Sequence, residues 1–233
     1  MSELIVSLPT DPGLREAIGD EAGVTFLTWD LDGPAPSERF DLVVPPYWGG
    51  NRQLAQLEGV DTRLVQWQSI GYNGVTKYLP AEVPLANAAT VHETSTAELA
   101  LALTLAAQRG IPEFVRDATE HRWDLRSFPS IADRRVLLIG YGGVSKAIEA
   151  RLAGFEVSIA RLARTAREET NLAGETVVVH GFSELHTQLA QAEIVILAVP
   201  LTDETRGLID AAAPAALPAD ALPGNVARGP AVD

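Results

Sequence analysis

The chain has 233 residues, of which 46% are hydrophobic, and a formal net charge of -13. This length and composition predict one large or two modest globular domains. Because the chain is acidic and has no block of lysine or arginine, we expect neither a nucleic-acid nor a membrane partner. It has no cysteine, which excludes disulfides, thiolate metal sites and cysteine nucleophiles. No metal site is expected, and a cytoplasmic location is favoured because no secretory signal is recognisable.

Residues 1–92 alternate short apolar runs with helical or turn-rich pieces. The runs are LIVSL, VTFLTW, DLVV, TRLVQW and VPLAN. DLVV and TRLVQW show no alternation of apolar and polar residues, which is typical of parallel strands covered on both faces. This pattern predicts a first open α/β domain over residues 1–92.

Residues 93–109 have the pattern of a long helix. Ser95 and Glu98 have the spacing of a capping box, and Gly110 with Pro112 is expected to end the helix. Its apolar residues cover nearly the whole circumference, so we expect it to be buried on most sides and to pass between two domains. Residues 111–135 are polar and interrupted by prolines, and we interpret them as an arm.

A strand, a glycine turn and a helix follow one another from Val136 to Ala153. This order is a dinucleotide-binding fingerprint, in which Gly140 makes the turn and Gly142 admits the phosphates. Gly143 and Val144 are expected to donate backbone N–H groups to them. The third glycine of G-x-G-x-x-G is replaced by Ser145, so the match is imperfect.

Later runs complete a second α/β unit over residues 93–233. Strands are predicted at 156–162, 176–180 and 193–200, with a helix after Ser183, which favours a parallel doubly wound sheet with ligands at the carboxyl ends of its strands. The last residues predict another strand and loop, although Pro223 and Gly224 are poor strand residues.

The cofactor is indicated by the residues after the second strand of this unit. NAD-preferring folds place an acidic residue about 20 positions after the glycine turn, but no acid occurs from Val157 to Arg167. Arginines stand at 161, 164 and 167 instead, and Arg164 with Thr165 offers the guanidinium and hydroxyl that a 2′-phosphate requires. NADP is therefore the preferred cofactor and NAD the alternative. A merely solvated arginine loop remains open as another interpretation.

Five segments in this order resemble the D-isomer-specific 2-hydroxyacid dehydrogenase family. They are SIGYNG (69–74), NAATVHETSTAE (87–98), VLLIGYGGVSKAI (136–148), VPLTDETRGLID (199–210) and NVARGPAVD (225–233). The resemblance implies a flavodoxin-like substrate domain followed by a Rossmann-type nucleotide-binding domain. It also implies a homodimer that uses NAD(P)H to reduce a small 2-oxo acid of the glyoxylate or hydroxypyruvate kind.

The resemblance also implies site residues. Arg228 matches the family's catalytic arginine and would bind the substrate's carboxylate and carbonyl oxygens, while the backbone N–H groups of Ile70 and Gly71 would complete the grip on the carboxylate. Trp48 would line the substrate pocket, with a packing anchor as the alternative. The adenosine or ribose side of the cofactor would contact Val199, Pro200 and Thr205, and Val226 and Ala227 would flank the nicotinamide.

The family's proton donor is a histidine held by a glutamate, and both follow the arginine in the chain. All the histidines of this sequence precede Arg228, and each is expected on the surface or at a loop cap; they are His92, His121, His180 and His186. The nucleotide domain is therefore expected to be incomplete at its C-terminus, as a fragment of a longer product or a decayed relative. An inactive NADP(H)-binding or sensing protein is the alternative function. A methyltransferase ranks last, because the acid after the second strand is missing.

Overall fold

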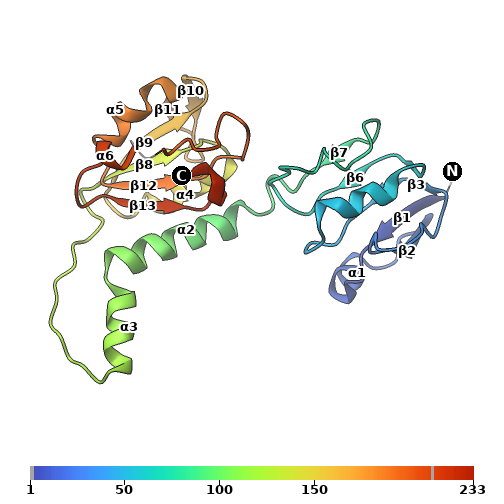
Figure 1. Ribbon diagram of the computed structural model, residues 1–233, viewed down its shortest axis with the longest axis horizontal. Coiled ribbons are helices and arrows are strands. Elements are labelled where there is room, and N and C mark those ends of the chain that lie inside the picture. Colours follow the sequence, from blue (N-terminus) through green and yellow to red (C-terminus); the bar gives the residue numbers. More distant parts are fainter. Residues whose placement is uncertain (1–2, 211–212) are drawn as a thin grey trace. The chain divides into compact units, whose positions relative to one another are not determined.

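Figure 1 shows the computed structural model, which describes residues 3–210 and 213–233. The chain divides into two compact units, Met1–Val91 and His92–Asp233. Each unit is an α/β fold around a sheet of its own, which confirms the fold class expected from the sequence.

The first unit is built on a five-stranded parallel sheet with the order β2-β1-β4-β6-β7. Its elements are β1 (Leu4–Leu8), α1 (Pro12–Ile18), β2 (Val24–Thr28), β3 (Arg39–Phe40), β4 (Leu42–Val43), a 3-10 helix (Asn51–Leu57), β5 (Asp61–Thr62), β6 (Val65–Gln66) and β7 (Leu85–Ala86). The short strands β3 and β5 pair separately. With these two set aside, the order is 2-1-3-4-5, which is that of flavodoxin-like folds.

The second unit contains a six-stranded sheet with the order β10-β11-β9-β8-β12-β13. Its elements are α2 (Glu93–Gln108), α3 (Ile111–Thr119), β8 (Arg135–Ile139), α4 (Gly143–Leu152), β9 (Ser158–Ala163), β10 (Arg167–Thr170), β11 (Thr176–Gly181), a 3-10 helix (Phe182–Glu184), α5 (Leu185–Leu189), β12 (Ile194–Leu197), α6 (Ala213–Ala216), β13 (Leu222–Asn225) and a second 3-10 helix (Gly229–Ala231). Strand β8 lies inside the sheet, and its residues 136–139 are completely buried. Such burial on both faces explains the unbroken apolar run of this strand.

The two edges of this sheet depart from the sequence pattern. β13 pairs in parallel with β12 despite Pro223 and Gly224, because an edge strand tolerates a residue that cannot donate to the ladder. The opposite edge strand, β10, is antiparallel to β11 and is not predicted by the pattern.

Helix α2 differs from its prediction in its cap and in its burial. The N-cap residue is His92, and Ser95 lies inside the first turn, where its hydroxyl donates to the His92 carbonyl at 3.2 Å, so the expected capping box does not form. One face of α2, which includes Ala97 and Ala100, is buried. Burial on most sides is not found, since Leu99 and Leu103 are each 54% exposed.

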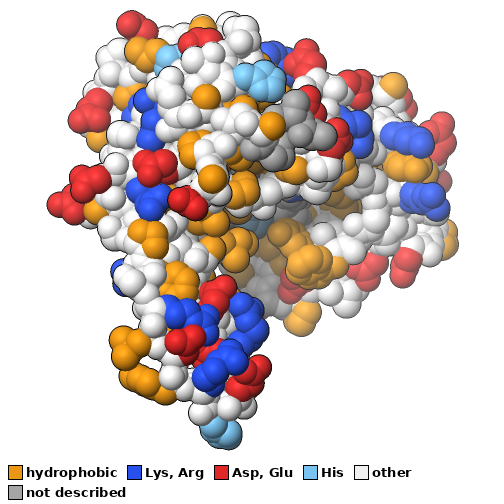
Figure 2. Space-filling view, turned by 60° about the vertical axis from the view of Figure 1, so that its left-hand side comes forward, with side chains coloured by type: hydrophobic (Ala, Val, Ile, Leu, Met, Phe, Trp, Pro, Cys, Tyr) orange, Lys and Arg blue, Asp and Glu red, His pale blue; other side chains and the backbone are white. Residues whose placement is uncertain are grey.

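The segment 111–135, which we expected to be an arm, begins with a helix that the sequence pattern did not predict, because residues 111–119 form α3. Pro112 lies in the first turn of this helix, where its missing N–H is not needed. The segment that follows is tied back to the helix. Buried Asp117 pairs with Arg122 and, at 2.6 Å, with Arg126. Figure 2 shows the acidic and basic side chains intermixed on this part of the unit, which protrudes at the bottom of the view.

Candidate functional site

Four parallel strands end at one edge of the sheet of the second unit, and the predicted site segments follow their carboxyl ends (Figure 1). The glycine turn follows β8, and Arg164 with Thr165 follows β9. Residues 199–200 follow β12, and residues 226–228 follow β13. The carboxyl edge of an open parallel sheet is where such folds bind their ligands. The fold thus brings together four segments that lie up to 88 positions apart in the sequence.

The glycine turn has the geometry that its residue types predict. Gly140 has a φ of +89°, and a Cβ atom there would lie 2.7 Å from the Ala198 carbonyl oxygen, so only glycine fits. Gly142 has open space where a Cβ would stand. It precedes α4, whose first residues are Gly143 and Val144. The backbone at Gly142 is therefore accessible to a ligand beside the N-terminus of a ten-residue helix.

Ser145 replaces the third glycine of the motif without opening the turn. The residue is completely buried, and its hydroxyl donates a hydrogen bond to the Gly140 carbonyl oxygen. A buried hydroxyl is tolerated when it has a partner. The serine therefore connects the first turn of α4 to the first glycine of the motif.

A buried polar network lies beside this turn, and the sequence pattern did not reveal it. The Tyr141 hydroxyl donates to Glu149 at 2.5 Å, and Asn171 donates to the same carboxylate at 2.9 Å. Arg161 donates to both carboxylate oxygens, at 2.7 and 2.9 Å. Burial opposes ionisation of Glu149, but the hydrogen bonds outweigh it, so the pKa of this carboxyl is lowered. Burial and the hydrogen bond to Glu149 raise the pKa of Tyr141.

The three arginines after the glycine motif have different partners. Arg161 is committed to Glu149, and its side chain is only 16% exposed. Arg167 donates to the Tyr141 carbonyl at 3.1 Å and pairs with Glu169. Arg164 is 62% exposed and forms an ion pair with Glu204 at 2.6 Å. Exposure and position at the end of β9 therefore favour Arg164 among the three as a ligand for a phosphate.

The loop after β12 is closed by its own side chains. Val199 is buried with its side chain against Gly140. The hydroxyl of Thr205 donates to the Pro200 carbonyl at 2.5 Å and accepts from the Thr202 N–H at 2.8 Å. Thr205 thus has a structural role in shaping this loop, and its contact with a cofactor stays a prediction.

The turn after β13 is held by Asn225. The amide side chain of Asn225 accepts from the Ala227 N–H at 2.9 Å and donates to the Arg228 carbonyl at 3.1 Å. Val226 and Ala227 are half-buried, whereas Arg228 is exposed. The Arg228 guanidinium donates to the Ala227 carbonyl at 2.8 Å. Its side chain therefore lies at the surface, beyond the carboxyl end of β13.

The predicted substrate residues Ile70, Gly71 and Trp48 belong to the first unit. The Ile70 carbonyl accepts from Asn87 at 3.0 Å, and the Gly71 carbonyl accepts from the Trp67 indole at 3.0 Å. These bonds shape the loop through its carbonyl oxygens. Trp48 is 93% exposed and meets Tyr47 edge to face, with 4.8 Å between ring centroids. It is thus not a buried packing anchor.

Comparison with known proteins connects this geometry to a family. Residues 101–233 match the family model of the NAD binding domain of D-isomer specific 2-hydroxyacid dehydrogenases. The chain belongs to this family. The match covers the strands whose carboxyl ends carry the glycine turn, Arg164 and Arg228.

Curated members of the family are similar over part of their length. A glyoxylate reductase from Pyrococcus horikoshii is 29% identical over 182 residues, which cover 73% of this chain and 53% of that protein. The dehydrogenase efuE from Hormonema carpetanum is 30% identical over 207 residues, which cover 87% of this chain and 51% of that protein. The chain therefore spans about half the length of these two relatives.

Solved structures show the same fold. A D-isomer specific 2-hydroxyacid dehydrogenase from Xanthobacter autotrophicus, in complex with NADPH and MES, has 28% identity and a TM-score of 0.74, over 98% of this chain and 74% of that one. A family protein from Aeromonas salmonicida reaches a TM-score of 0.80 at 20% identity, over 100% of this chain and 75% of that one, and supports the fold alone.

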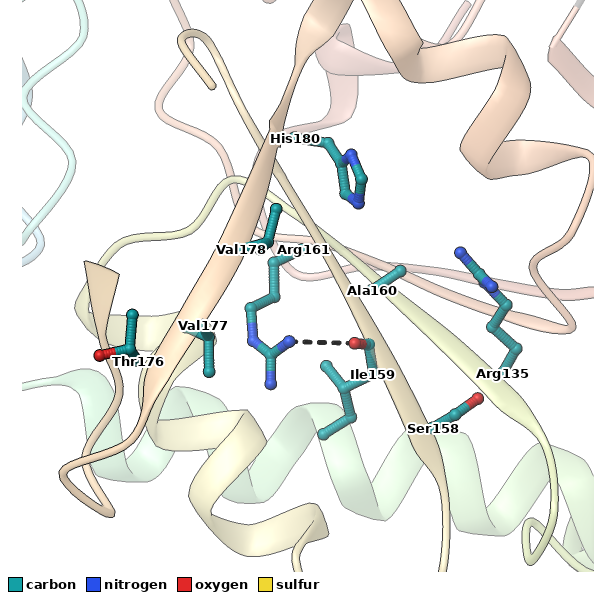
Figure 3. Close-up of a pocket in the computed structure, with 9 residues that line it drawn as sticks. All are labelled: Arg135, Ser158, Ile159, Ala160, Arg161, Thr176, Val177, Val178 and His180. Atoms are coloured by element: carbon teal, nitrogen blue, oxygen red, sulfur yellow. Dashed lines mark hydrogen bonds between the residues drawn. The ribbon is translucent and has the colours of Figure 1, made fainter. Parts of the chain in front are cut away.

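A cavity of about 380 Å³ lies between β9 and β11, away from the glycine turn at residues 140–143 (Figure 3). The two strands pair only from His180 and Gly181 onward, so they diverge toward their amino ends. Figure 3 shows Arg161 in this gap, with a hydrogen bond of 3.1 Å to the Ile159 carbonyl. Because the gap opens away from the carboxyl edge, we do not assign the cavity to the cofactor.

The histidines of the chain lie away from Arg228 or at a helix cap. His180 pairs with Glu184 at 2.9 Å, but β11 is four strand positions from β13, which corresponds to roughly 19 Å. His121 and His186 are exposed, and His92 occupies the N-cap position of α2. The His180–Glu184 pair of the second unit therefore lies far from the strand that precedes the arginine.

Within residues 3–210 and 213–233, no group of three or more His, Cys, Asp or Glu side chains has a geometry suited to a metal ion. None of the helices in those ranges is long and apolar enough to cross a membrane.

Proposed function

We propose that the protein is an NADP(H)-dependent dehydrogenase that transfers a hydride between the cofactor and a small 2-oxo or 2-hydroxy acid. The observation that carries this proposal is the common edge of β8, β9, β12 and β13, which bears the glycine turn, Arg164 and Arg228. The similar glyoxylate reductase from Pyrococcus horikoshii supports a substrate of the glyoxylate or hydroxypyruvate kind.

The residues of the glycine turn fit a dinucleotide. The open space at Gly142 allows close approach of a pyrophosphate, and the N–H groups of Gly143 and Val144 at the start of α4 are its donors. We assign the adenosine and ribose contacts to Val199, Pro200 and Thr205. Arg164 and Thr165, both exposed at the end of β9, are assigned to a 2′-phosphate. The related Xanthobacter autotrophicus protein is known with NADPH, which supports NADP over NAD.

Arg228 is assigned to the substrate. A 2-oxo acid has a carboxylate and a polarised carbonyl oxygen, and a guanidinium binds both through charge-assisted hydrogen bonds. The Arg228 guanidinium would also stabilise the negative charge that develops on the carbonyl oxygen during reduction, for which a bound nicotinamide cofactor would supply the hydride. Val226 and Ala227 would flank the nicotinamide. In the first unit, we assign the N–H groups of Ile70 and Gly71 to the substrate's carboxylate and Trp48 to the lining of the substrate pocket.

An inactive NADP(H)-binding or sensing protein is the second candidate. It is favoured by the position of the His180–Glu184 pair, which lies four strand positions from β13, the strand that precedes Arg228. Absence of a general acid lowers a rate by about 10² to 10⁴, whereas it leaves cofactor binding intact. Binding and turnover therefore separate the two candidates.

The test is a fluorescence titration of the 233-residue protein with NADPH and NADH, followed by NADPH oxidation with glyoxylate or hydroxypyruvate. If the protein is a dehydrogenase, it should bind NADPH tightly and oxidise it in the presence of the acid. The variant Arg228→Ala should abolish this turnover. Binding without turnover, also in any longer product of the same reading frame, supports the sensing protein. Failure to bind either cofactor rejects both candidates.

We also propose that the protein acts in the cytoplasm.

A second copy of the chain, we propose, covers the apolar surface near α2 and α3. Leu99 and Leu103 on α2 are exposed, and Trp123 and Leu125 after α3 are 91% and 88% exposed. Exposed apolar residues of this size are typical of protein interfaces. Analytical ultracentrifugation should give a dimer for the protein, and Trp123→Ser with Leu125→Ser should give a monomer.

A further inference from the structure

The Arg164–Glu204 ion pair bridges two loops on opposite sides of the glycine turn. Arg164 follows β9 and Glu204 follows β12, and β8 lies between these strands in the sheet. Nε of Arg164 and Oε2 of Glu204 are 2.6 Å apart. The pair therefore passes over the carboxyl end of β8, the strand that leads into Gly140.

The backbone beside the pair is held by hydrogen bonds, while the two side chains are largely exposed to solvent. The Gly140 N–H donates to the Leu162 carbonyl at 2.8 Å, and the Ala198 N–H donates to the Ile139 carbonyl at 2.8 Å. Arg164 and Glu204 are 62% and 60% exposed, respectively. An ion pair with this exposure stabilises a protein only weakly, so a ligand can displace or share it.

The sequence has no acid from Val157 to Arg167, where NAD-preferring folds carry one. Glu204 supplies a carboxylate at this place from another strand end, because it contacts the first residue after β9. A carboxylate accepts hydrogen bonds from the 2′-hydroxyl of NADH, but it repels the 2′-phosphate of NADPH and occupies the guanidinium that this phosphate requires.

We propose that Glu204 is a specificity-determining residue, which supports NADH binding and limits the preference for NADPH that Arg164 confers. This inference rests on the proposed function, in which the glycine turn binds NADP(H). Arg164 binds the 2′-phosphate of NADPH, and Glu204 accepts a hydrogen bond from the 2′-hydroxyl of NADH. The pair therefore sets the ratio of the affinities for NADPH and NADH.

The experiment measures dissociation constants for NADPH and NADH at low ionic strength with the full chain. Glu204→Gln should bind NADPH about three- to fivefold more tightly and NADH about two- to fivefold more weakly, as expected for one exposed charge. Arg164→Gln should weaken NADPH binding and leave NADH binding unchanged. Asp203→Asn is the matched control, because it removes an exposed acid from the neighbouring position without touching the pair.

An unchanged affinity ratio in Glu204→Gln, or an equal change in Asp203→Asn, overturns this inference while cofactor binding stands. A wild-type chain that binds neither cofactor rejects the proposed function and this inference with it. Circular dichroism and thermal unfolding of each variant identify any change that comes from misfolding.

Discussion

The carboxylate of Glu149 on α4 forms a two-pronged ion pair with Arg161 on β9, at 2.7 and 2.9 Å. Their side chains are 8% and 16% exposed. The pair connects α4 to the strand beside β8, and the Tyr141 hydroxyl joins it from the glycine turn. It stabilises the helix that begins at this turn and withdraws Arg161 from the set of arginines available to a phosphate.

Glu149→Gln should destabilise the protein by about 3 kcal/mol, because it leaves the Arg161 guanidinium buried without an opposite charge. Urea unfolding followed by circular dichroism measures the loss. The double variant Glu149→Leu with Arg161→Leu is the control, and it should recover much of the stability, since an apolar pair needs no desolvated charge. A single variant as stable as the wild type would show that the pair contributes little.

Gly140→Ala and Gly142→Ala should separate folding from binding. At Gly140 the φ angle is positive and a Cβ would meet the Ala198 carbonyl. The free energy of unfolding of this variant should therefore fall by about 1–3 kcal/mol, and the variant should lose cofactor binding. At Gly142 a Cβ has open space, so the variant should fold as the wild type does and lose NADPH affinity. Thermal unfolding and NADPH titration check both. An unchanged affinity in Gly142→Ala would argue against pyrophosphate contact at this residue.

Ser145→Gly should lower stability even though it restores the third glycine of the motif. Loss of the hydrogen bond to the Gly140 carbonyl should lower the free energy of unfolding by about 1 kcal/mol, and the lower helix propensity of glycine relative to serine should lower it by about 0.5 kcal/mol more. Ser145→Ala should lose only the stabilisation from the hydrogen bond. Urea unfolding ranks the three proteins, and a Ser145→Gly variant more stable than the wild type contradicts the assigned role.

Asp41 should make the stability of the first unit depend on pH. The Ile5 N–H and then the Arg39 guanidinium bond to the Asp41 carboxylate and lower its pKa from 3.8 to about 2. Because the folded pKa is the lower one, the stabilisation is present above about pH 4 and is lost as the pH falls toward 2. Asp41→Asn should therefore lower Tm at pH 7, and the difference from wild type should shrink between pH 4 and pH 2. Glu82→Gln, an exposed acid of the same unit, is the control and should show no such convergence.

Much of the fold, and of the candidate site at the carboxyl edge of the second sheet, could be predicted because both depend on short sequence patterns. Apolar runs predicted the parallel strands, and the glycines at 140 and 142 predicted the turn after β8. The order of the segments also indicated the family, which the match to residues 101–233 confirms. One element that this pattern did not predict is β10, a polar strand whose residues 167–170 carry no apolar signal and depend on pairing with β11.

The sequence by itself determined the two α/β units, the turn that only glycine can make and the arginine-rich strand end. Only the tertiary structure decided which of those arginines is the most exposed to solvent. Arg161, Arg164 and Arg167 look alike along the chain, but their partners Glu149, Glu204 and Glu169 come from different elements. The same holds for the acid missing after β9, because a carboxylate 40 positions away reaches Arg164 once β9 and β12 flank β8 in one sheet. Ion pairs form through space, and spacing along a chain does not encode them.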